Sequence, residues 1–437
     1  MASEKEKIYI ALLGVGTVGS GVLSVLENNH EDITHKSAAD LRIKKILEVN
    51  PAVIELLQDK YSITQDIEEI LCDPEIKIVV ELIGREEPAR TFIKRALEAG
   101  KNVVTANKDV IAKYGQELFA VAEAKQVSLF FEASVGGGIP IVRPLKQCLA
   151  ANKIRKVMGI MNGTTNYMLT KMTEEKMDYP VVLKEAQEQG FAESDPTADV
   201  GGFDAARKLV ILASIAYNTR FNMEQVYIEG IQKISARDIE YATEFGYVVK
   251  LLAIAEDCGE LGVNLRVHPT FLPKDHPLAN VGGVFNGIFV SGDAVDDVMF
   301  YGRGAGKMPT ASAVCADIMD VAHNITSHNI NNFTCGCYKN TPVCSINMMH
   351  FPFYIRLVVA DKPGVLSAIA AAFGSQEVSI HSVLQKQRKS DDNADLVIVT
   401  HSTQESNLRM AIQTLAIMSA VVEVSSVIRL EGEEPND

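Results

Sequence analysis

The chain has 437 residues, of which 47% are hydrophobic and 22% charged, with a formal net charge of −14. This length and composition exclude a disordered chain and allow two or three domains, each with its own hydrophobic core. The negative charge, without clusters of Lys and Arg, argues against a nucleic-acid partner or an anionic membrane surface, so we expect small-molecule partners.

The N-terminus, MASEKEKIYIALLG, is charged where a secretory signal would be apolar, and no apolar run is long enough to span a membrane. We therefore expect a cytoplasmic protein. The seven cysteines are scattered and odd in number, so they do not form a disulfide framework. The TCGC stretch and Cys344 lack partners at zinc spacing, which favours ordinary reduced thiols.

The first predicted element is a buried strand, KIYIALL, which leads through GVGTVGSG into a helix. Strand and helix patterns then alternate as far as residue 135, with further strands at RIKKILEV, KIVVELI, NVVTA and VSLFFEAS. This alternation predicts an α/β domain over residues 1–135, built on a doubly wound parallel sheet of the Rossmann type.

The glycine loop of this domain fits the dinucleotide-binding fingerprint. Gly14 allows the tight turn, Gly16 lets the backbone approach a pyrophosphate, and Gly19 lets the helix pack closely. A strand before the loop and a helix after it favour this interpretation over a purely structural turn. Cofactor contacts are also expected from the residues between these glycines, Thr17 and Val18.

The end of the second strand predicts which nicotinamide cofactor binds. Glu48 ends this strand, where an acid favours NAD and a nearby Arg favours NADP. Arg85, after the strand KIVVELI, is still able to reach a 2′-phosphate. The sequence therefore leaves NAD and NADP both open.

Beyond SVGGGIP the pattern changes to a mixed α+β domain over residues 136–306, with a helix near 307–325 that returns to complete the first domain. Residues 326–352 lack periodicity and indicate a linker. Residues 353–437 follow the order strand, helix, strand, strand, helix, strand, which predicts an independently folding unit of the ferredoxin-like type. We expect this tail to be removable after about residue 350.

Two polar segments suggest ligand contacts. Asn107 and Lys108 follow a predicted strand, at the edge where ligands bind in such sheets. Asn162 and Thr164, in MNGTTNYML, belong to a dense array of neutral donors and acceptors that suits a small polar ligand. Each segment by itself also fits a capped turn.

The stretch GFAESDPTADVGGFDAARK, residues 190–208, gathers carboxylates directly before the apolar run LVILASIAY. Asp204 and Lys208 lie four residues apart, so on a helix they share one face, which Ile211 continues. A half-buried Lys208, near a second cation such as Lys108, is suited to proton transfer. A surface ion pair beside a Gly-Pro loop explains the same residues without a function.

Taken together, GVGTVG, TANKD, NGTTNY, GFAESDPTADVGGFDAARK and GRGAGKMPTASAV resemble homoserine dehydrogenases in order and approximate spacing over residues 5–325, and the tail from Phe353 is similar to an ACT domain. The resemblance implies interconversion of L-homoserine and L-aspartate 4-semialdehyde with NAD or NADP, in the route to threonine and methionine. It also implies a catalytic and dimerisation role for residues 136–306, a homodimer or homotetramer, and threonine as the effector.

The resemblance further assigns roles to individual residues. Lys208 becomes the proton donor or acceptor with Asp204 beside it, and Lys108 meets both cofactor and substrate. Substrate contacts fall to Glu193, which binds the amino group, and to Asp199, Asn162 and Thr164. Further cofactor contacts fall to Thr105 and Gly306; a sodium or potassium site to Glu132, Val135, Gly137 and Ile139; and an effector site to Asp361 and Gly364.

Two departures and two alternatives stand beside this resemblance. Family members commonly have Gly-Gly where this chain has Gly84-Arg85, and commonly have an Arg near the position of Glu48. A thiol-dependent semialdehyde dehydrogenase requires a reactive Cys at a strand end, but Cys148 lies in a helical pattern. An inactive amino-acid sensor is disfavoured by the intact Lys108, Asp204 and Lys208.

Overall fold

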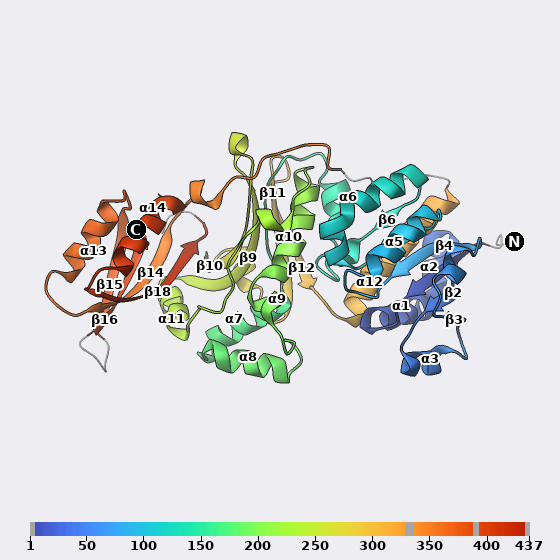
Figure 1. The fold of residues 1–437 in the computed structure, drawn as a ribbon, viewed down its shortest axis with the longest axis horizontal. Coiled ribbons are helices and arrows are strands. Elements are labelled where there is room, and N and C mark those ends of the chain that lie inside the picture. The colour runs from blue at the N-terminus through green and yellow to red at the C-terminus, as the bar shows by residue number, and fades with distance from the viewer. Residues whose placement is uncertain (1–4, 328–335, 388–392, 433–437) are drawn as a thin grey trace. The chain divides into compact units, whose positions relative to one another are not determined.

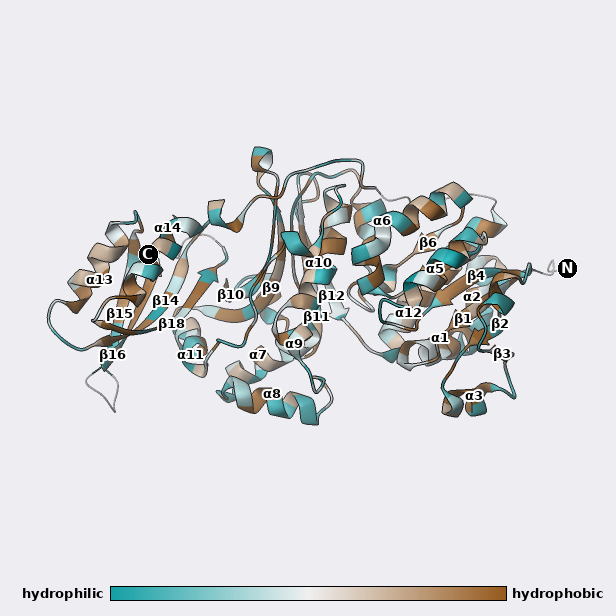
Figure 2. Cartoon of the chain, in the orientation of Figure 1, coloured by the Kyte–Doolittle hydropathy of each residue, from teal (hydrophilic) through white to brown (hydrophobic). Residues whose placement is uncertain are grey.

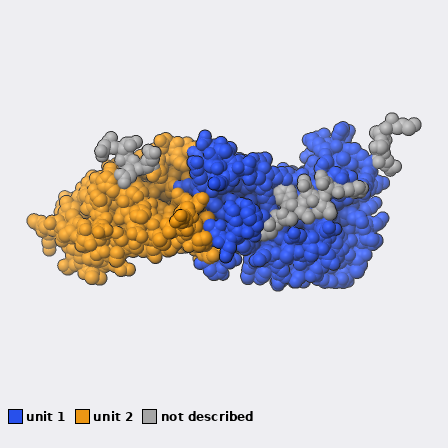
Figure 3. Space-filling view, turned by 90° about the horizontal axis from the view of Figure 1, so that it is seen from above, with its two compact units in different colours: residues 1–157, 207–224, 286–341 blue, residues 158–206, 225–285, 342–437 orange. Residues whose placement is uncertain are grey.

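The computed structural model describes residues 5–327, 336–387 and 393–432 (Figure 1). The chain divides into two compact units, shown in Figure 3. Unit 1 contains residues 1–157, 207–224 and 286–341, and unit 2 contains residues 158–206, 225–285 and 342–437. Helix α10, Phe203–Ala216, gives its first residues to unit 2 and the rest to unit 1.

Unit 1 contains a parallel six-stranded sheet in the order β3-β2-β1-β4-β5-β6. This order is that of a dinucleotide-binding sheet, and it confirms the predicted doubly wound fold. The loops at the carboxyl ends of β1 and β4 flank the point where the strand order reverses, which is where ligands bind in such sheets. The strands are β1 Glu6–Leu13, β2 Ala39–Leu47, β3 Ile63–Thr64, β4 Ile76–Glu81, β5 Asn102–Thr105 and β6 Leu129–Phe130.

Apolar strands and helices form the core of unit 1. Ile10 and Leu12 of β1 pack with Val22 of α1 and with Val314 and Ile318 of α12, all fully buried. The strands are continuous apolar runs because both faces of a parallel sheet are covered by helices, and in Figure 2 they are mostly brown. The helices are α1 Thr17–Asn28, α2 His30–Ser37, α3 Pro51–Leu57, α4 Glu68–Leu71, α5 Ala89–Glu98, α6 Lys108–Lys125 and α12 Lys307–Thr326.

The sixth strand is shorter than its sequence predicts. VSLFFEAS suggests a full strand, but β6 ends at Phe130 and a 3-10 turn, Glu132–Ser134, follows. The Glu132 N–H donates to the Asp317 side chain at 2.9 Å, so a side chain on α12 takes the donor that a longer strand would have used.

Unit 2 contains a run of paired strands, β9-β10-β18-β14-β16-β15. Its helices α7, α8, α9 and α11 belong to the predicted mixed α+β region. The bounds are α7 Gly163–Glu175, α8 Tyr179–Glu188, α9 Thr197–Val200, α11 Ala236–Glu244, α13 Val365–Gly374, α14 Glu405–Ala416, β8 Tyr227–Ile228, β9 Tyr247–Asp257, β10 Val263–Pro273, β13 His350–Phe351, β14 Phe353–Ala360, β15 Ile380–Gln387, β16 Asn393–Thr400, β17 Thr403–Gln404 and β18 Val421–Leu430. The mixed region also contains β7 Ile154–Ile160, β11 Phe285–Gly292 and β12 Asp297–Arg303.

The C-terminal tail has the predicted order of elements and its own apolar core, which includes Phe353, Ile369 and Leu408. Its sheet does not stop at the tail, however. Strand β18 pairs antiparallel with β14 and also parallel with β10, with Thr270 opposite Arg429 (Figure 1). Truncation after about residue 350 would therefore uncover the edge of β10, which the sequence pattern did not indicate.

Two sequence expectations fall partly outside the described residues. Residues 328–335 of the expected linker, which include Cys335 of the TCGC stretch, are not described. The described part of that segment contains a short 3-10 turn, Ile346–Met348, and β13. Among the described residues, no helix combines the length and hydropathy needed to cross a membrane.

Candidate functional site

The glycine loop joins β1 to α1 at the carboxyl edge of the parallel sheet. Gly14 has a φ of +87°, which favours glycine, and its N–H donates to Leu47 O at 2.9 Å. A Cβ on Gly19 would lie 2.4 Å from Gly14 O, so no side chain fits there. At Gly16 no described atom lies within 4 Å of an added Cβ. The loop therefore has no free space at Gly19, where the helix packs, and has free space at Gly16, where a phosphate would approach. Helix α1 starts directly after Gly16, at Thr17.

Glu48 lies at the end of β2, against this loop. One carboxylate oxygen accepts the Val15 N–H at 2.8 Å, and the other accepts the N–H groups of Val49 and Asn50 at 2.8 and 2.9 Å. The side chain is buried. The carboxylate therefore fixes the glycine loop and holds an acidic group at the position that contacts the adenosine ribose in such folds.

Glu81, at the end of β4, is a site candidate that sequence reasoning missed. It is fully buried, and its carboxylate accepts the Thr105 hydroxyl at 2.6 Å and the Ile83 N–H at 2.8 Å. Burial raises the pKa of the Glu81 carboxyl, against the opposing effect of these hydrogen bonds. Its signal in the sequence was an acid at the end of a buried strand, in KIVVELIG.

The first turn of α6 carries Lys108, directly after β5. Asn107 caps this helix by accepting the Val110 N–H at 3.1 Å, and its amide donates to Arg85 O at 2.7 Å. Asp109 pairs with Arg207 at 2.9 Å. This ion pair brings the start of α6 beside the second turn of α10, so Lys108 and Lys208 lie on neighbouring helical turns within unit 1.

Arg85 lies in the loop after β4. It is exposed and has a φ of +61°, following Gly84 at +73°. The positive φ shows that this position has the left-handed backbone that favours glycine, although its residue here is Arg.

The carboxylates of residues 190–208 are gathered by one amide. Asn162 begins α7 as its N-cap and accepts the Thr165 N–H at 2.8 Å. Its Nδ2 donates to Asp199 at 2.7 Å and to Asp204 at 2.9 Å. Asn162 therefore caps a helix and also donates to two carboxylates. The capped-turn interpretation and the ligand-site interpretation of this segment are compatible.

The other polar residues of this region lie further out. Thr164 donates to Phe191 O at 2.7 Å, and Glu193 is exposed in the loop between α8 and α9. Asp195 accepts from Thr197, and this hydrogen bonding lowers the pKa of the Asp195 carboxyl. Asp195 therefore fixes the turn that leads into α9.

Helix α10 presents Asp204 and Lys208 one turn apart, as predicted. Asp204 is buried, Lys208 is half-buried, and Leu209 and Leu212 are fully buried. This arrangement differs from the solvated i,i+4 ion pair that was the plain alternative, because the acid is held inside by Asn162.

Glu132 lies in a second acidic cluster, at the start of the 3-10 turn. Its carboxylate accepts the N–H groups of Ile141, Val142 and Arg143 at 2.6 to 2.9 Å. Burial and the charge of Glu132 raise the pKa of the neighbouring Asp317 to about 8, although Arg143 also contacts Asp317 at 3.0 Å. Backbone curvature nearby is set by positive φ values at Gly136 and Gly137, and Gly306 caps α12 with a φ of +125°.

The tail contains a pocket of about 390 Å³ around the loop between β14 and α13. Gly364 has a φ of +89° and no described atom within 4 Å of an added Cβ, and Asp361 accepts from Gln385 at 3.1 Å. Helix α13 begins at Val365, with the left-handed Gly364 as its N-cap, so Pro363 lies just before the helix.

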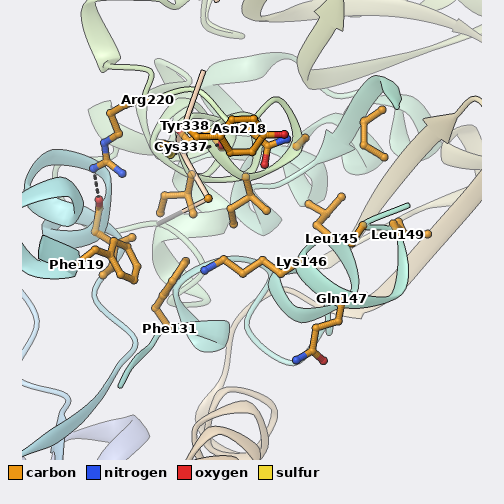
Figure 4. Close-up of a pocket in the computed structure, with 18 of the residues that line it drawn as sticks. Phe119, Phe131, Leu145, Lys146, Gln147, Leu149, Asn218, Arg220, Cys337 and Tyr338 are labelled. Atoms are coloured by element: carbon orange, nitrogen blue, oxygen red, sulfur yellow. Dashed lines mark hydrogen bonds between the residues drawn. The ribbon is translucent and has the colours of Figure 1, made fainter. Parts of the chain in front are cut away.

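A separate pocket of about 490 Å³ lies in unit 1, between α6 and the later turns of α10 (Figure 4). Figure 4 shows Lys146 reaching toward Phe119 and Phe131, with its Nζ 4.9 Å from the Phe131 ring centre. Arg220 donates to Ile111 O at 2.7 Å. None of the residues predicted for the site is among its described lining residues.

Comparisons with known proteins assign the chain to a family. Residues 140–319 match the family model described as homoserine dehydrogenase, residues 14–132 match the NAD-binding domain of homoserine dehydrogenase, and residues 353–416 match the ACT domain. A homoserine dehydrogenase from Synechocystis is 44% identical, with 97% of this chain and 99% of that protein covered. One from Bacillus subtilis is 41% identical, with 98% and 99% covered.

Solved structures agree. A homoserine dehydrogenase from Thiobacillus denitrificans has a TM-score of 0.92 at 42% identity, with 98% of this chain and 99% of that chain covered. A hyperthermophilic archaeal homoserine dehydrogenase in complex with NADPH has a TM-score of 0.61 at 28% identity, with 72% and 97% covered. The chain therefore belongs to the homoserine dehydrogenase family and is an NAD(P)-dependent oxidoreductase that acts on a CH–OH group.

Proposed function

We propose that this enzyme interconverts L-homoserine and L-aspartate 4-semialdehyde with Lys208 as the proton donor or acceptor. The observation that carries this proposal is the grouping of Asp199 and Asp204 on Asn162, with Lys208 one helical turn after Asp204. A buried carboxylate next to a half-buried amine is an arrangement that supports general acid and base chemistry.

In the oxidation direction, Lys208 accepts the proton of the substrate hydroxyl, and in the reduction direction it returns that proton to the aldehyde oxygen. Asp204 orients the hydroxyl, and Glu193 and Asp199 bind the substrate ammonium. When bound, the nicotinamide cofactor takes or gives the hydride. Lys108, at the start of α6, contacts both molecules and keeps them in register.

The residues that would hold the cofactor are the glycine loop, Thr105 and Gly306, and they fit a dinucleotide because the loop is open at Gly16. The archaeal relative binds NADPH. We propose that the present chain uses NAD at least as well as NADP, because the Glu48 carboxylate repels a 2′-phosphate. Arg85 is the exposed cation able to offset that repulsion.

We also propose a sodium or potassium site at Glu132 with the backbone carbonyls of Val135, Gly137 and Ile139. A cation fits here because Glu132 and Asp317 are two buried acids, joined by a hydrogen bond from the Glu132 N–H to Asp317, and Arg143 contacts Asp317. The positive charge would stabilise the ionised pair.

The ACT-like tail supports a regulatory role, with threonine as the proposed effector. The pocket at Asp361 and Gly364 lies at the start of α13, and the N-terminus of a helix suits an amino-acid carboxylate. Gly364→Asp would place a negative charge there and should abolish any threonine response, while Gly364→Ala keeps the site neutral. We further propose a homodimer or homotetramer acting in the cytoplasm.

One assay tests these proposals together. NAD(P)H formation from L-homoserine is measured with each cofactor, in sodium, potassium and tetramethylammonium salts, with and without threonine. The proposals predict turnover that responds to the salt, that is at least as efficient with NAD as with NADP, and that falls at millimolar threonine. Full activity in tetramethylammonium salt contradicts a need for the cation. If calorimetry detects no threonine binding and threonine does not inhibit, the tail is an assembly module instead.

A further inference from the structure

A partly buried charge cluster joins the tail to another segment of unit 2, residues 227–231; within it Arg429 and Glu405 are buried, and the Glu229 side chain is 36% exposed. Arg429, on β18, donates to the two carboxylate oxygens of Glu405 at 2.8 and 2.6 Å. The same guanidinium donates to Glu229 at 3.1 Å and to the Tyr227 hydroxyl at 3.1 Å. The Arg429 and Glu405 side chains are 6% and 3% exposed. A bidentate pair this deeply buried has one geometry, so Glu229 is held against a fixed cation.

The residues that follow Tyr227 contact the junction between α9 and α10. The Glu229 N–H donates to Val267 O at 2.8 Å, which holds this segment on β10. The Ile231 N–H donates to Val200 O at 2.9 Å. A Cβ on Gly230 would lie 2.1 Å from Gln232 Oε1 and 2.3 Å from Val200 O, so the backbone of Gly230 packs closely on Val200 and leaves no room for a larger residue.

That junction carries the acids of the proposed substrate site. Asp199 directly precedes Val200, Asp204 lies in the first turn of α10, and both accept from Asn162. A close-packed backbone contact transmits a displacement because it has no free space to absorb it.

We propose that Glu229, fixed by Arg429, is a positioning residue: the segment 229–231 sets where Asp199 and Asp204 lie, and thereby sets the affinity for homoserine. This inference rests on the proposed roles of those two acids. Since Arg429 belongs to the tail, this series of contacts also links the tail indirectly to Asp199 and Asp204.

Glu229→Gln tests the inference with little change in volume. The variant weakens the tie to Arg429, so the homoserine KM should rise roughly threefold to tenfold, while kcat and the cofactor KM change less than about twofold. The matched control is Lys386→Gln, which breaks the tail's 2.7 Å pair with Glu244, both 48% exposed. This control should leave all three kinetic constants unchanged.

Gly230→Ala adds a Cβ that clashes with Val200 O, so it displaces the same junction and should raise the homoserine KM further. If that variant does not fold, Glu229→Gln decides alone. A wild-type homoserine KM in Glu229→Gln overturns the inference. An equal rise in the cofactor KM also overturns it, because that result indicates a general loss of structure.

A double variant separates this inference from the site it rests on. Asp199→Asn should raise the homoserine KM, and adding Glu229→Gln should raise it by less than about twofold more, because both act on one carboxylate. If the two substitutions raise the homoserine KM by independent factors that multiply, the positioning role of Glu229 is overturned, while the assignment of Asp199 to the substrate site still stands. A wild-type KM in Asp199→Asn removes the site assignment itself, and the inference with it.

Discussion

The parallel sheet of unit 1 and the tail-bearing sheet of unit 2 hold their buried charges in different ways. Glu48 ends a strand and is satisfied by three backbone N–H groups at that strand end and in the adjoining glycine loop. In unit 2 acids face arginines far along the chain: the buried Asp238 bonds Arg356, 118 residues away, and the partly exposed Glu229 bonds the buried Arg429, 200 residues away.

These two ways of binding a carboxylate suggest two roles: one contacts a ligand, and the other holds elements of the fold together. Backbone N–H groups satisfy the Glu48 carboxylate, and we propose that this acid acts on a ligand at the sheet edge. An arginine fork neutralises its carboxylate and fixes two elements to one another. Substitutions of the first kind should change cofactor use, and substitutions of the second kind should change stability or substrate affinity. The following four tests break or sharpen that distinction.

The largest effect is expected at Lys208. Lys208→Ala removes the proposed proton donor or acceptor, so kcat should fall by a factor of about 10² to 10⁴, while the cofactor still binds. Steady-state kinetics and cofactor titration measure both. The control is Lys184→Ala, whose side chain is 79% exposed in a 3.8 Å pair with Glu188. Near wild-type kcat in Lys208→Ala would sink the assignment.

The second effect concerns assembly. Arg356→Met leaves the fully buried Asp238 without the cation that donates to it at 2.8 Å, so the free energy of unfolding should fall by about 3 to 5 kcal/mol. Adding Asp238→Leu should recover part of this loss, because the remaining charge is removed. Thermal unfolding measures each variant. A fall below about 1 kcal/mol would show that the tail is held mainly by its strand pairing. Truncation after residue 350 removes both Arg356 and β18, so it should also destabilise unit 2.

The third effect is a pH dependence at the second acidic cluster. The pKa of Asp317 is raised to about 8, so between its unfolded value and 8 the folded chain binds this proton more tightly than the unfolded chain. This contribution to stability is therefore present at low pH and is lost as the pH rises toward 8. Asp317→Asn keeps an acceptor and does not titrate. Relative to it, the wild type should lose about 2 to 3 kcal/mol between pH 5 and 7.

The measurement for Asp317 is denaturant unfolding across pH, in sodium and in tetramethylammonium salts. A bound sodium ion should reduce the pH dependence by stabilising the ionised acids. Parallel stability curves for the wild type and Asp317→Asn would contradict the raised pKa.

The smallest effect is expected at Glu48. Glu48→Gln removes the charge that repels a 2′-phosphate, so kcat/KM for NADP relative to NAD should rise roughly threefold to tenfold. Arg85→Gln should change the ratio in the opposite direction. A wild type that strongly prefers NADP, with a ratio unaffected by Glu48→Gln, would show that another cation decides the preference.

Several features were predictable from the sequence because their causes are local. The glycine spacing requires a turn that packs at Gly19 and opens at Gly16, and alternating apolar patterns require a parallel sheet with helices on both faces. The four-residue spacing of Asp204 and Lys208 requires one helix face. The order of elements in the tail follows from the same periodicities.

Tertiary structure alone decided the rest. Asn162 reaches Asp199 and Asp204 across 37 and 42 residues, which no local periodicity indicates. The pairing of β18 with β10 and the contact of Arg429 with Glu229 join segments that lie far apart in the sequence. The sequence pattern of a strand shows which of its faces is apolar, but not which neighbouring strand it pairs with. The sequence also does not show which distant residue a charged side chain pairs with in the folded protein. Local sequence therefore specified the glycine loop and the helix of Asp204 and Lys208, and long-range packing specified how Asp199 and Asp204 are gathered on Asn162 and how the tail is attached.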